Sequence, residues 1–393
     1  MPKNKWNVDS EYIVAIRREL HMYPELNYEN PLTLGIIRRE LDKLELPYTE
    51  NFGRGGVVAT LNEGKGAYTI GIRADMDAIP MQEVNDIPYK STIDGNMHAC
   101  GHDIHTAILL GTAKALSEMK DEIACCVKFI FQTAEEGPDT GARYMVADGV
   151  MDDIDVIVAQ HVDNSIEIGQ VGLTAGPALA LCHPFKIILE GEATHITTPQ
   201  KGKDALAMAV RVHQAITTMV ATEVDPFEPF ICGIGTCKSG TSFGSVSGYT
   251  EMDGVITTYD MDLDAFLTKR VETIVKNVAE EVGGTGRLEH EITCLVTKND
   301  PDLCERVTSS AEKVLGAGNC LTLKQILGCE DFSFFQSKKP GVLFWLGSGN
   351  KAKGFTSYLH NNDFMPDEDS FELGSSIFVQ FVQDNMNSSG ERQ

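Results

Sequence analysis

The chain has 393 residues with 42% hydrophobic and 23% charged content, proportions typical of a globular protein with a sizeable core and room for two domains. Its formal net charge of −24 argues against a nucleic-acid partner, because phosphate binding requires a basic surface. No run approaches the roughly 18 apolar residues of a membrane span, and the start MPKNKWNVDSEY lacks the apolar core of a secretory signal. Ten scattered cysteines without a CxxC pair fit free thiols, so we expect a cytoplasmic protein with no membrane partner.

Residues 9–163 alternate between amphipathic helices and apolar runs. Helices are predicted at 9–22, with Asp9 or Ser10 as the cap, at 31–46, directly after the motif at 97–107, and at 139–150. Strands are predicted at 55–61, 67–78, 126–137 and 154–163. This alternation is typical of an α/β fold with a mixed, mostly parallel sheet flanked by helices.

Polar side chains follow the apolar part of three of these strands, namely Asp75, Glu135, Glu136 and His161. In parallel sheets, functional groups collect beyond the carboxyl ends of the strands. We therefore expect these residues to share one site.

Residues 183–296 have a different pattern of predicted strands and helices. Strands are predicted at 183–192, 230–240, 254–261 and 288–296, and helices at 204–220 and 263–282. This order is the pattern of a small α+β ferredoxin-like domain. The alternation of helices and apolar strands resumes near residue 298, with a helix predicted at 301–315, a strand at 340–347 and a last helix over 371–386. We predict one domain from residues 1–182 and 297–393, which contains these polar strand ends, and an inserted domain from 183–296.

The stretch MHACGHDIHTA (97–107) concentrates groups that can bind a metal. A thiol, three imidazoles and a carboxylate lie at the start of a predicted helix, namely His98, Cys100, His102, Asp103 and His105. Thiolate and neutral imidazole are the ligands that borderline transition metals prefer. A helix start that is merely rich in histidine is the alternative, but the density of donors around Gly101 favours half of a metal site.

The adjacent pair Glu135 and Glu136 also needs an explanation, because like charges repel. Two solvated loop carboxylates would explain an isolated pair. Together with Cys100, His102, His161 and a distant His360, the pair favours metal-assisted hydrolysis of an amide: one carboxylate binds a metal and its neighbour takes a proton from metal-activated water. Cys100 as a covalent nucleophile is the rival chemistry.

With these motifs in place, the chain resembles the M20 metallopeptidase superfamily, in the amidohydrolase branch that includes hippurate hydrolase, N-acyl-amino-acid aminoacylases and auxin-conjugate hydrolases. The resemblance rests on motifs that span essentially the whole chain in the same order, namely RRELHMYPEL (17–26), GIRADMDAIPMQE (71–83), MHACGHDIHTAILLG (97–111), FQTAEEGPDTGARYMVADGV (131–150), QHVDNSIEIG (160–169), GCEDFS (328–333) and LHNNDFMPDE (359–368). It implies a catalytic domain like that of the zinc exopeptidases.

The resemblance also implies roles for individual residues. The metal ligands would be Cys100, His102, Glu136, His161 and His360, holding two divalent ions of Zn²⁺, Mn²⁺, Co²⁺ or Ni²⁺ bridged by Cys100. Glu135 would be the general base, and Asp75 and Asp103 would orient the ligand histidines. For Asp75, a strand-end cap or a salt bridge to Arg73 is the alternative. His98 and His105 read as structural residues.

The inserted domain would be a lid and homodimerisation module. His195 would reach across the dimer to stabilise the oxyanion, with a plain surface-strand histidine as the alternative. Two positions depart from the family: Gly244 stands where relatives have asparagine, and Thr257 where they have arginine. Both groups are associated with holding the substrate, and threonine cannot replace a bidentate guanidinium.

The leading hypothesis is a metal-dependent amidohydrolase that acts on a small N-acyl amino acid or a related conjugate. The alternative keeps this chemistry for a substrate without the α-carboxylate, such as an aryl or alkyl amide, a dipeptide-like conjugate or an amine lost by hydrolytic deamination. A non-catalytic binding protein is disfavoured, because Glu135 and all five ligand positions are present.

Overall fold

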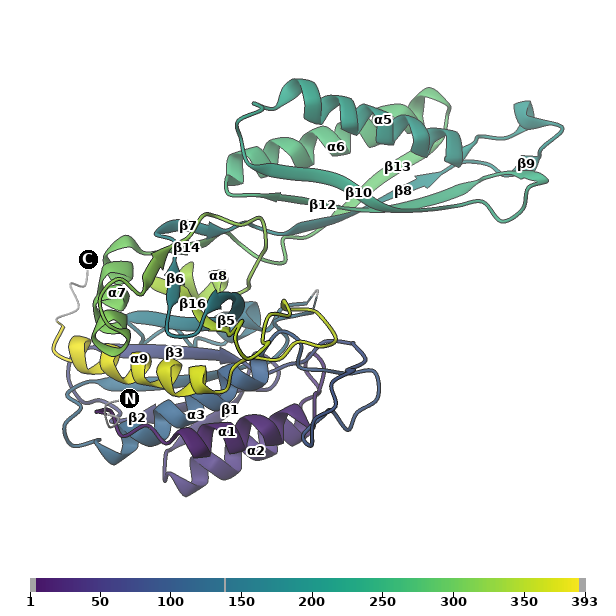
Figure 1. Cartoon of the computed structure of the whole chain (residues 1–393). Coiled ribbons are helices and arrows are strands. Elements are labelled where there is room, and N and C mark those ends of the chain that lie inside the picture. The colour runs from purple at the N-terminus through teal and green to yellow at the C-terminus, as the bar shows by residue number, and fades with distance from the viewer. Residues whose placement is uncertain (1–4, 138, 389–393) are drawn as a thin grey trace. The chain divides into compact units, whose positions relative to one another are not determined.

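The structure, a computed structural model, describes residues 5–137 and 139–388 (Figure 1). The chain forms two compact units. The first contains the chain up to Ala178, Thr297–Gln325 and the chain from Asp331 onwards, and the second contains Leu179–Val296 with Ile326–Glu330. Each unit has a hydrophobic core of its own. No helix among the described residues is both long enough and apolar enough to cross a membrane.

The first unit is built on an eight-stranded sheet in the order β1-β2-β4-β3-β5-β16-β6-β15. Its strands are β1 (Tyr48–Phe52), β2 (Gly56–Leu61), β3 (Thr69–Asp75), β4 (Cys126–Gln132), β5 (Val156–Glu167), β6 (Val171–Leu173), β15 (Cys320–Thr322) and β16 (Gly341–Gly349). The four central strands β4, β3, β5 and β16 are parallel, β1 and β2 pair antiparallel with their neighbours, and β6 is antiparallel to β16 but parallel to β15. The predicted α/β class with a mixed, mostly parallel sheet is confirmed.

Helices pack on this sheet because each has a continuous apolar face. Helices α1 (Ser10–His21), α2 (Pro31–Lys43), α3 (His102–Glu118), α7 (Pro301–Leu315) and α9 (Asp369–Asn385) share one core with β2, β3, β4, β5 and β16 (Figure 1). The short helices α4 (Gly141–Ala147) and α8 (Ser333–Gln336) contact each other. Asp9 caps α1, because its Oδ1 accepts a hydrogen bond of 3.0 Å from the backbone N–H of Tyr12.

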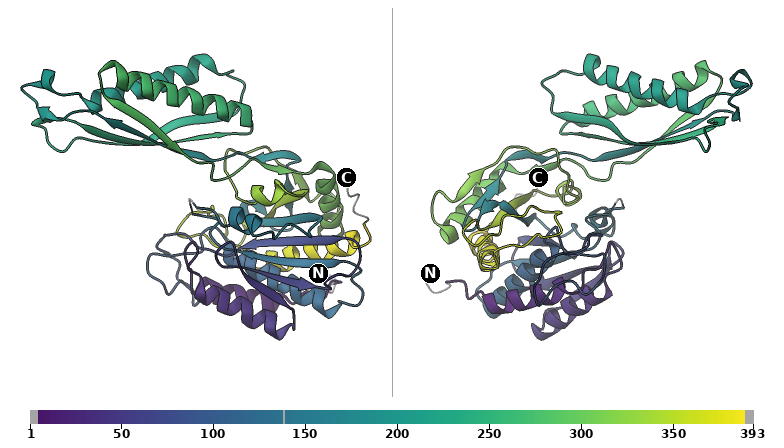
Figure 2. Two further views of the ribbon diagram at one scale, coloured as in Figure 1. Left: turned by 180° about the vertical axis from the view of Figure 1, so that it is seen from behind. Right: turned by 45° about the vertical axis from the view of Figure 1, so that its right-hand side comes forward.

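The second unit has the predicted order of elements and a four-stranded antiparallel sheet, β10-β12-β8-β13 (Figure 2). Its elements are β8 (His183–Glu190), α5 (Ala205–Glu223), β10 (Phe230–Ser239), β12 (Tyr249–Thr258), α6 (Met261–Glu281) and β13 (Thr285–His290). Helices α5 and α6 lie side by side on one face of the sheet, with a core between. The strand predicted at 288–296 is misplaced: β13 begins earlier, because Gly283 with φ +72° turns the chain directly after α6.

Four short strands complete the description. In the second unit β9 (Thr194–His195) pairs with β11 (Ser245–Val246), next to the 3-10 turn η1 (Pro199–Lys201). Strands β7 (Gly176–Leu179) and β14 (Thr297–Asn299) pair with each other. Both lie where the chain passes between the two units.

Candidate metal centre

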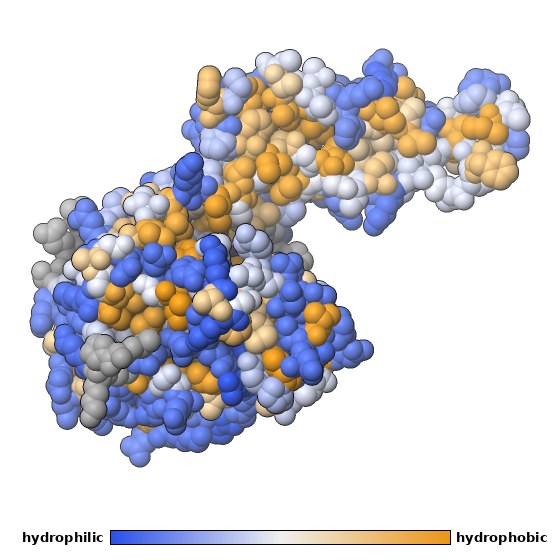
Figure 3. Space-filling model, in the orientation of Figure 1, coloured by the Kyte–Doolittle hydropathy of each residue, from blue (hydrophilic) through white to orange (hydrophobic). Residues whose placement is uncertain are grey.

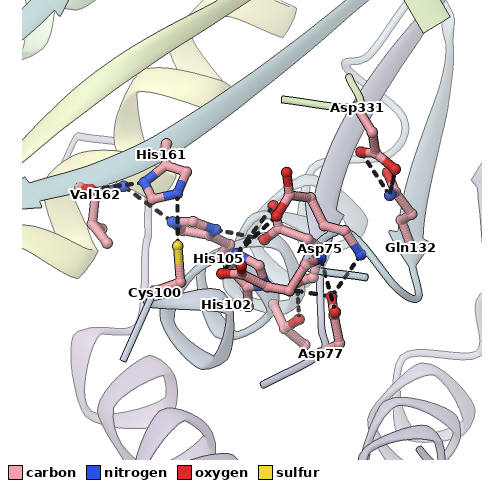
Figure 4. A network of polar contacts seen from close by, with 12 residues as sticks. Asp75, Asp77, Cys100, His102, His105, Gln132, His161, Val162 and Asp331 are labelled. Carbon is pink, nitrogen blue, oxygen red and sulfur yellow. Dashed lines mark hydrogen bonds and ion pairs between the residues drawn. The ribbon is translucent and has the colours of Figure 1, made fainter. Parts of the chain in front are cut away.

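Candidate site residues of the first unit gather beyond the carboxyl ends of β3 and β4 and along β5 (Figure 4). Strand β3 ends at Asp75, Glu135 and Glu136 follow the end of β4, and His161 lies within β5. These strands are parallel neighbours, so their carboxyl ends lie at one edge of the sheet. The same edge receives the start of α3 at His102.

Gly101 allows Cys100 and His102 to approach this edge together. It is the N-cap of α3 and has φ +92°, a left-handed conformation that favours glycine. A Cβ at this position would lie only 2.4 Å from Cγ2 of Val162, the residue after His161. The glycine is therefore required both by the turn and by the close approach to β5.

The five residues implied as ligands form one cluster, which we call the donor cluster. Cys100, His102 and His161 form one group, and Cys100, Glu136 and His360 form a second; within each group the candidate ligand atoms lie within 4.8 Å of one another. Cys100 Sγ is 3.4 Å from His161 Nε2, and His360 Nε2 is 3.2 Å from Glu136 Oε1. The two groups overlap at Cys100.

The donor cluster fits divalent transition metals. Both ring nitrogens of His102 are buried: Nε2 makes no hydrogen bond to any residue that the structure describes, and Nδ1 has only Asp77 Oδ1 nearby, at 3.4 Å. Its Nε2 lies 3.9 Å from carboxylate oxygens of both Glu135 and Glu136. A buried imidazole without a hydrogen bond is costly, and a bound cation would satisfy it. Thiol, imidazole and carboxylate are also the donor types such metals select.

The electrostatics of the donor cluster favour a bound cation as well. Burial, followed by the charges of Glu136 and Glu135, raises the pKa of the Cys100 thiol well above its usual value. Burial opposes ionisation of Glu136, but the neighbouring His360 and His102 lower its pKa to about 2. When ionised, the Cys100 thiol and the carboxyl groups of Glu135 and Glu136 would therefore repel one another. A divalent cation would stabilise both the thiolate and the carboxylate.

His161 is held neutral and correctly oriented. Its Nδ1–H donates to the backbone oxygen of Val162 at 2.8 Å, which leaves the Nε2 lone pair facing Cys100 (Figure 4). Burial and the neighbouring His105 lower the pKa of His161 to about 3. The neutral imidazole is the form that binds a metal.

His105 has both nitrogens engaged within the protein. Nδ1 donates to Asp75 Oδ1 at 2.6 Å, and Nε2 accepts a 3.0 Å hydrogen bond from the backbone N–H of Val162. Neither nitrogen is free for a metal, and the ring instead fixes the backbone directly after His161.

Asp75 and Asp103, the two aspartates that we expected to orient ligand histidines, make their hydrogen bonds with other residues. Asp75 accepts from His105 and from Arg73 Nη1 at 2.6 Å, and its nearest approach to His102 is 3.7 Å. Asp103 bonds His21 Nδ1 at 2.7 Å, because its position in the first turn of α3 faces α1. In the structure, neither carboxylate makes a hydrogen bond to an implied ligand.

Asp77 holds the paired glutamates, a contact that the sequence analysis missed. Its two carboxylate oxygens accept hydrogen bonds from the backbone N–H groups of Glu135, at 3.0 Å, and Glu136, at 3.1 Å. Its Oδ1 also lies 3.4 Å from His102 Nδ1. Ala134, just before the pair, has φ +54°, a conformation that costs energy for a non-glycine residue. The Asp77 clamp therefore holds a strained turn that presents both glutamates.

Arg73 supports the same edge, and its 2.6 Å ion pair with Asp75 is the alternative role considered for that aspartate. Its guanidinium is fully buried and contacts Asp75, Gln132 at 2.8 Å and Asp331 at 2.9 Å. Asp331 also accepts hydrogen bonds from the Gln132 side chain (Figure 4). It accepts another from the backbone N–H of Ala142. The signal in the sequence was a charged residue inside an apolar strand.

His195 lies in the second unit, on β9, where it pairs with Ser245 of β11. The side chain is exposed, and its Nδ1 lies 2.7 Å from Thr197 Oγ1. Its other nitrogen, Nε2, takes part in no hydrogen bond with the described residues.

The two positions that depart from the family also lie in the second unit. Gly244 is exposed and accepts a backbone hydrogen bond from Ile196. Thr257 is buried, and its hydroxyl donates to the backbone oxygen of Leu181 at 2.7 Å. A hydroxyl engaged in this way is not a donor for a substrate carboxylate.

Comparison with known proteins gives a consistent assignment. The model of the family described as peptidase family M20/M25/M40 matches residues 71–384. Thermostable carboxypeptidase 1 of Saccharolobus solfataricus is 35% identical over 377 residues, which cover 95% of this chain and 95% of the relative. N-acyl-L-amino acid amidohydrolase of Geobacillus stearothermophilus is 36% identical over 273 residues, which cover 70% of this chain and 74% of the relative.

A solved structure supports the fold. The YXEP protein of Bacillus subtilis, described as a dinuclear metal binding peptidase from the M20 family, superposes with a TM-score of 0.82 at 26% identity. The match covers 96% of this chain and 98% of the other. It therefore includes both compact units.

Proposed function

The chain belongs to the peptidase family M20/M25/M40, in its amidohydrolase branch, and from this premise we propose that it is a metal-dependent amidohydrolase that cleaves the amide bond of a small N-acyl amino acid or a related conjugate. The observation that carries the proposal is the position of Glu135 and Glu136. Asp77 holds both backbones, Glu136 belongs to the donor cluster with Cys100 and His360, and Glu135 lies beside His102.

Each residue then has a distinct task. When bound, divalent cations supply Lewis acidity that polarises the amide carbonyl and lowers the pKa of water at the site. Glu135 takes a proton from the attacking water and delivers it to the leaving amine nitrogen. Glu136, Cys100, His102, His161 and His360 would hold the cations. Cys100, His102 and His161 are buried, whereas the side of the cluster at Glu136 and His360 is open to solvent.

We propose that two cations bind and share Cys100. The two donor groups overlap only at its sulfur, with His102 and His161 on one side and Glu136 and His360 on the other. A bridging thiolate would balance two divalent charges more effectively than a terminal ligand. Metal analysis of the reloaded protein is expected to give two equivalents per chain, and Cys100→Ser is expected to lose both. Retention of one equivalent in Cys100→Ser would contradict the bridge.

The proposed function is tested by replacing Glu135 with glutamine after reloading with Mn²⁺, Zn²⁺, Co²⁺ or Ni²⁺. Loss of the base is expected to lower kcat about 10³-fold while the metal content stays unchanged. Glu122→Gln, at an exposed site outside the cluster, is the matched control and should retain full turnover. A Glu135→Gln variant that keeps more than a tenth of the activity would contradict the assigned role.

Thr257 and Gly244 favour a second candidate, the same chemistry on a substrate without an α-carboxylate. Neither position offers a cationic or amide donor, and the Thr257 hydroxyl is engaged with Leu181. A panel of N-acyl amino acids and their matched carboxamides separates the candidates. Higher kcat/KM for the free acids supports the first, and higher kcat/KM for the carboxamides supports the second.

We further propose that the second unit mediates a homodimer. Strand β10 is an edge of its sheet and presents unpaired backbone groups. Leu206 and Val210 on α5 and Ile231 on β10 are each about half exposed, and Figure 3 shows apolar surface on this unit. A groove of about 290 Å³ adjoins α5. Val210→Glu is expected to yield monomers by light scattering, whereas Val282→Glu, at an exposed site at the end of α6, should not.

A further inference from the structure

Three free thiols meet at the base of the second unit, away from the donor cluster in the sequence. They are Cys182, Cys294 and Cys329. Both the Cys182 and the Cys294 thiols affect the pKa of the Cys329 thiol, so both lie beside it. Cys329 thus lies between two possible partners. We call these three residues the thiol cluster.

The backbone already holds the three segments together. Cys182 and Cys294 are directly opposite in an antiparallel bridge, with N–H···O distances of 2.9 and 3.4 Å in the two directions. The segment with Cys329 is attached by a 2.9 Å hydrogen bond from the N–H of Ala180 to the oxygen of Gly328. Paired segments at this spacing bring their side chains within reach of a disulfide.

The thiol cluster lies where the chain passes between the two units. Cys182 follows the entry into the second unit at Leu179, and Cys294 precedes the exit at Val296. Cys329 lies in Ile326–Glu330, a short segment of the second unit placed between two stretches of the first. The residue after this segment is Asp331, the partner of Arg73. A covalent bond in the cluster would therefore join the crossing segments.

We propose that the thiol cluster is a redox modification site, in which a peroxide drives a reversible disulfide between Cys329 and either Cys182 or Cys294. Cys329 attacks hydrogen peroxide to give a sulfenic acid and one water. The neighbouring thiol then attacks the sulfenic sulfur, which forms the disulfide and releases a second water. Two thiols lose two hydrogens and two electrons to one peroxide, and a dithiol reductant reverses the step.

We expect the Cys329 thiol to react first, because Cys329 is the most exposed of the three cysteines. Cys329 is exposed, Cys182 is partly buried and Cys294 is buried. The contact with Cys182 lowers the pKa of the Cys329 thiol, but the contact with Cys294 and the enclosure of its sulfur raise the pKa to about 12, although the residue as a whole is exposed. The thiolate fraction is therefore small near pH 7, and oxidation is slow there. Because the thiolate is the nucleophile, the oxidation rate is expected to rise about tenfold per pH unit between roughly pH 7 and 9.

The disulfide is expected to stabilise the protein. A cross-link between residues far apart in the sequence reduces the conformational freedom of the unfolded chain. The oxidised protein should therefore unfold at a Tm several degrees above that of the reduced protein. This readout does not depend on catalysis, so failure of the amidohydrolase proposal would leave it intact.

The test treats the full-length, metal-loaded protein with hydrogen peroxide and maps disulfides by mass spectrometry of peptides. The expected result is one peptide pair containing Cys329 with Cys182 or Cys294, a higher Tm, and recovery of both features after dithiothreitol. Cys329→Ser should lose the pair and the Tm shift. Cys237→Ser, at an exposed cysteine on β10, should keep both.

Other outcomes overturn the proposal. A disulfide that persists in Cys329→Ser, or modification confined to Cys100, would show that the thiol cluster is not the redox site. Binding of one equivalent of Zn²⁺ that requires all three thiols and blocks oxidation would identify a thiolate metal site instead. The double variant Cys182→Ser/Cys294→Ser retains Cys329 but lacks both of its proposed partners. If Cys329 is oxidised in this variant without forming a disulfide, Cys182 and Cys294 are confirmed as the partners.

Discussion

The donor cluster of the first unit and the β9–β11 pair of the second unit are held in opposite ways. Around the donor cluster, supporting side chains are buried and multiply bonded, as Asp75, Asp77 and Arg73 show. On the β9–β11 pair, His195 is exposed and held only by the hydroxyl and the backbone N–H of Thr197, and Gly244, just before β11, has no side chain. The comparison predicts that the buried network sets the position of the metal donors, whereas the lightly constrained residues of the second unit contact the substrate.

The sharpest test of this contrast removes the centre of the buried network. Arg73→Met would leave the carboxylates of Asp75 and Asp331 buried without their cation, which is expected to cost about 3–5 kcal/mol of unfolding free energy. Urea unfolding followed by far-ultraviolet circular dichroism, which reports on the helices of both units, measures this cost.

The matched control lies in the second unit. Arg287 forms an exposed ion pair with Glu190, and Arg287→Met should leave unfolding nearly unchanged because water and salt screen such pairs. If Arg73→Met were as mild as Arg287→Met, the buried network would not be the rigid element that the comparison requires.

The second prediction concerns the exposed side of the comparison. If His195 donates a hydrogen bond to the developing oxyanion, His195→Ala should lower kcat about 10²-fold with little change in KM, because the interaction forms only in the transition state. Steady-state kinetics with the best substrate of the panel measures this. Thr197→Ala, which removes the partner of the ring, should give a smaller loss. If kcat is the same in His195→Ala and in the unmodified protein, His195 is a surface histidine without a role in catalysis.

Sequence reasoning succeeded where the signal was local and failed where it depended on long-range geometry. The fold class followed from the alternation of apolar runs and helices, and the strand ends that carry Asp75, Glu135 and Glu136 followed from parallel strands. The two hydrogen bonds that Asp77 accepts from backbone N–H groups depend on the left-handed turn at Ala134, and no pattern of side chains in the sequence predicts this turn. Likewise, the direction of Asp103 toward α1 is set by packing between helices distant in sequence.

The third prediction tests whether this missed residue matters. Asp77→Asn keeps the size of the side chain but removes its charge and replaces one acceptor oxygen with a donor, so one backbone N–H of the glutamate pair loses its partner. Metal affinity or activity is expected to fall about 10- to 100-fold, the range typical of residues that orient metal ligands. Metal titration of the apo protein measures the first effect directly. Asp86→Asn, outside the donor cluster, is the control, and equal metal affinity in both variants would argue against the clamp.

The smallest expected effect separates a structural from a substrate-binding role at Thr257. Thr257→Val keeps the shape of the side chain but removes the hydrogen bond to the Leu181 oxygen, which should cost about 1 kcal/mol of unfolding free energy. Because the hydroxyl is already engaged in the protein, kcat/KM for N-acyl amino acids and for their carboxamides should stay in the same ratio. A selective loss of activity on the free acids would instead show that Thr257 contacts the carboxylate. The second unit would then carry a substrate anchor made from a hydroxyl, and substrate preference would depend on buried as well as exposed residues of that unit.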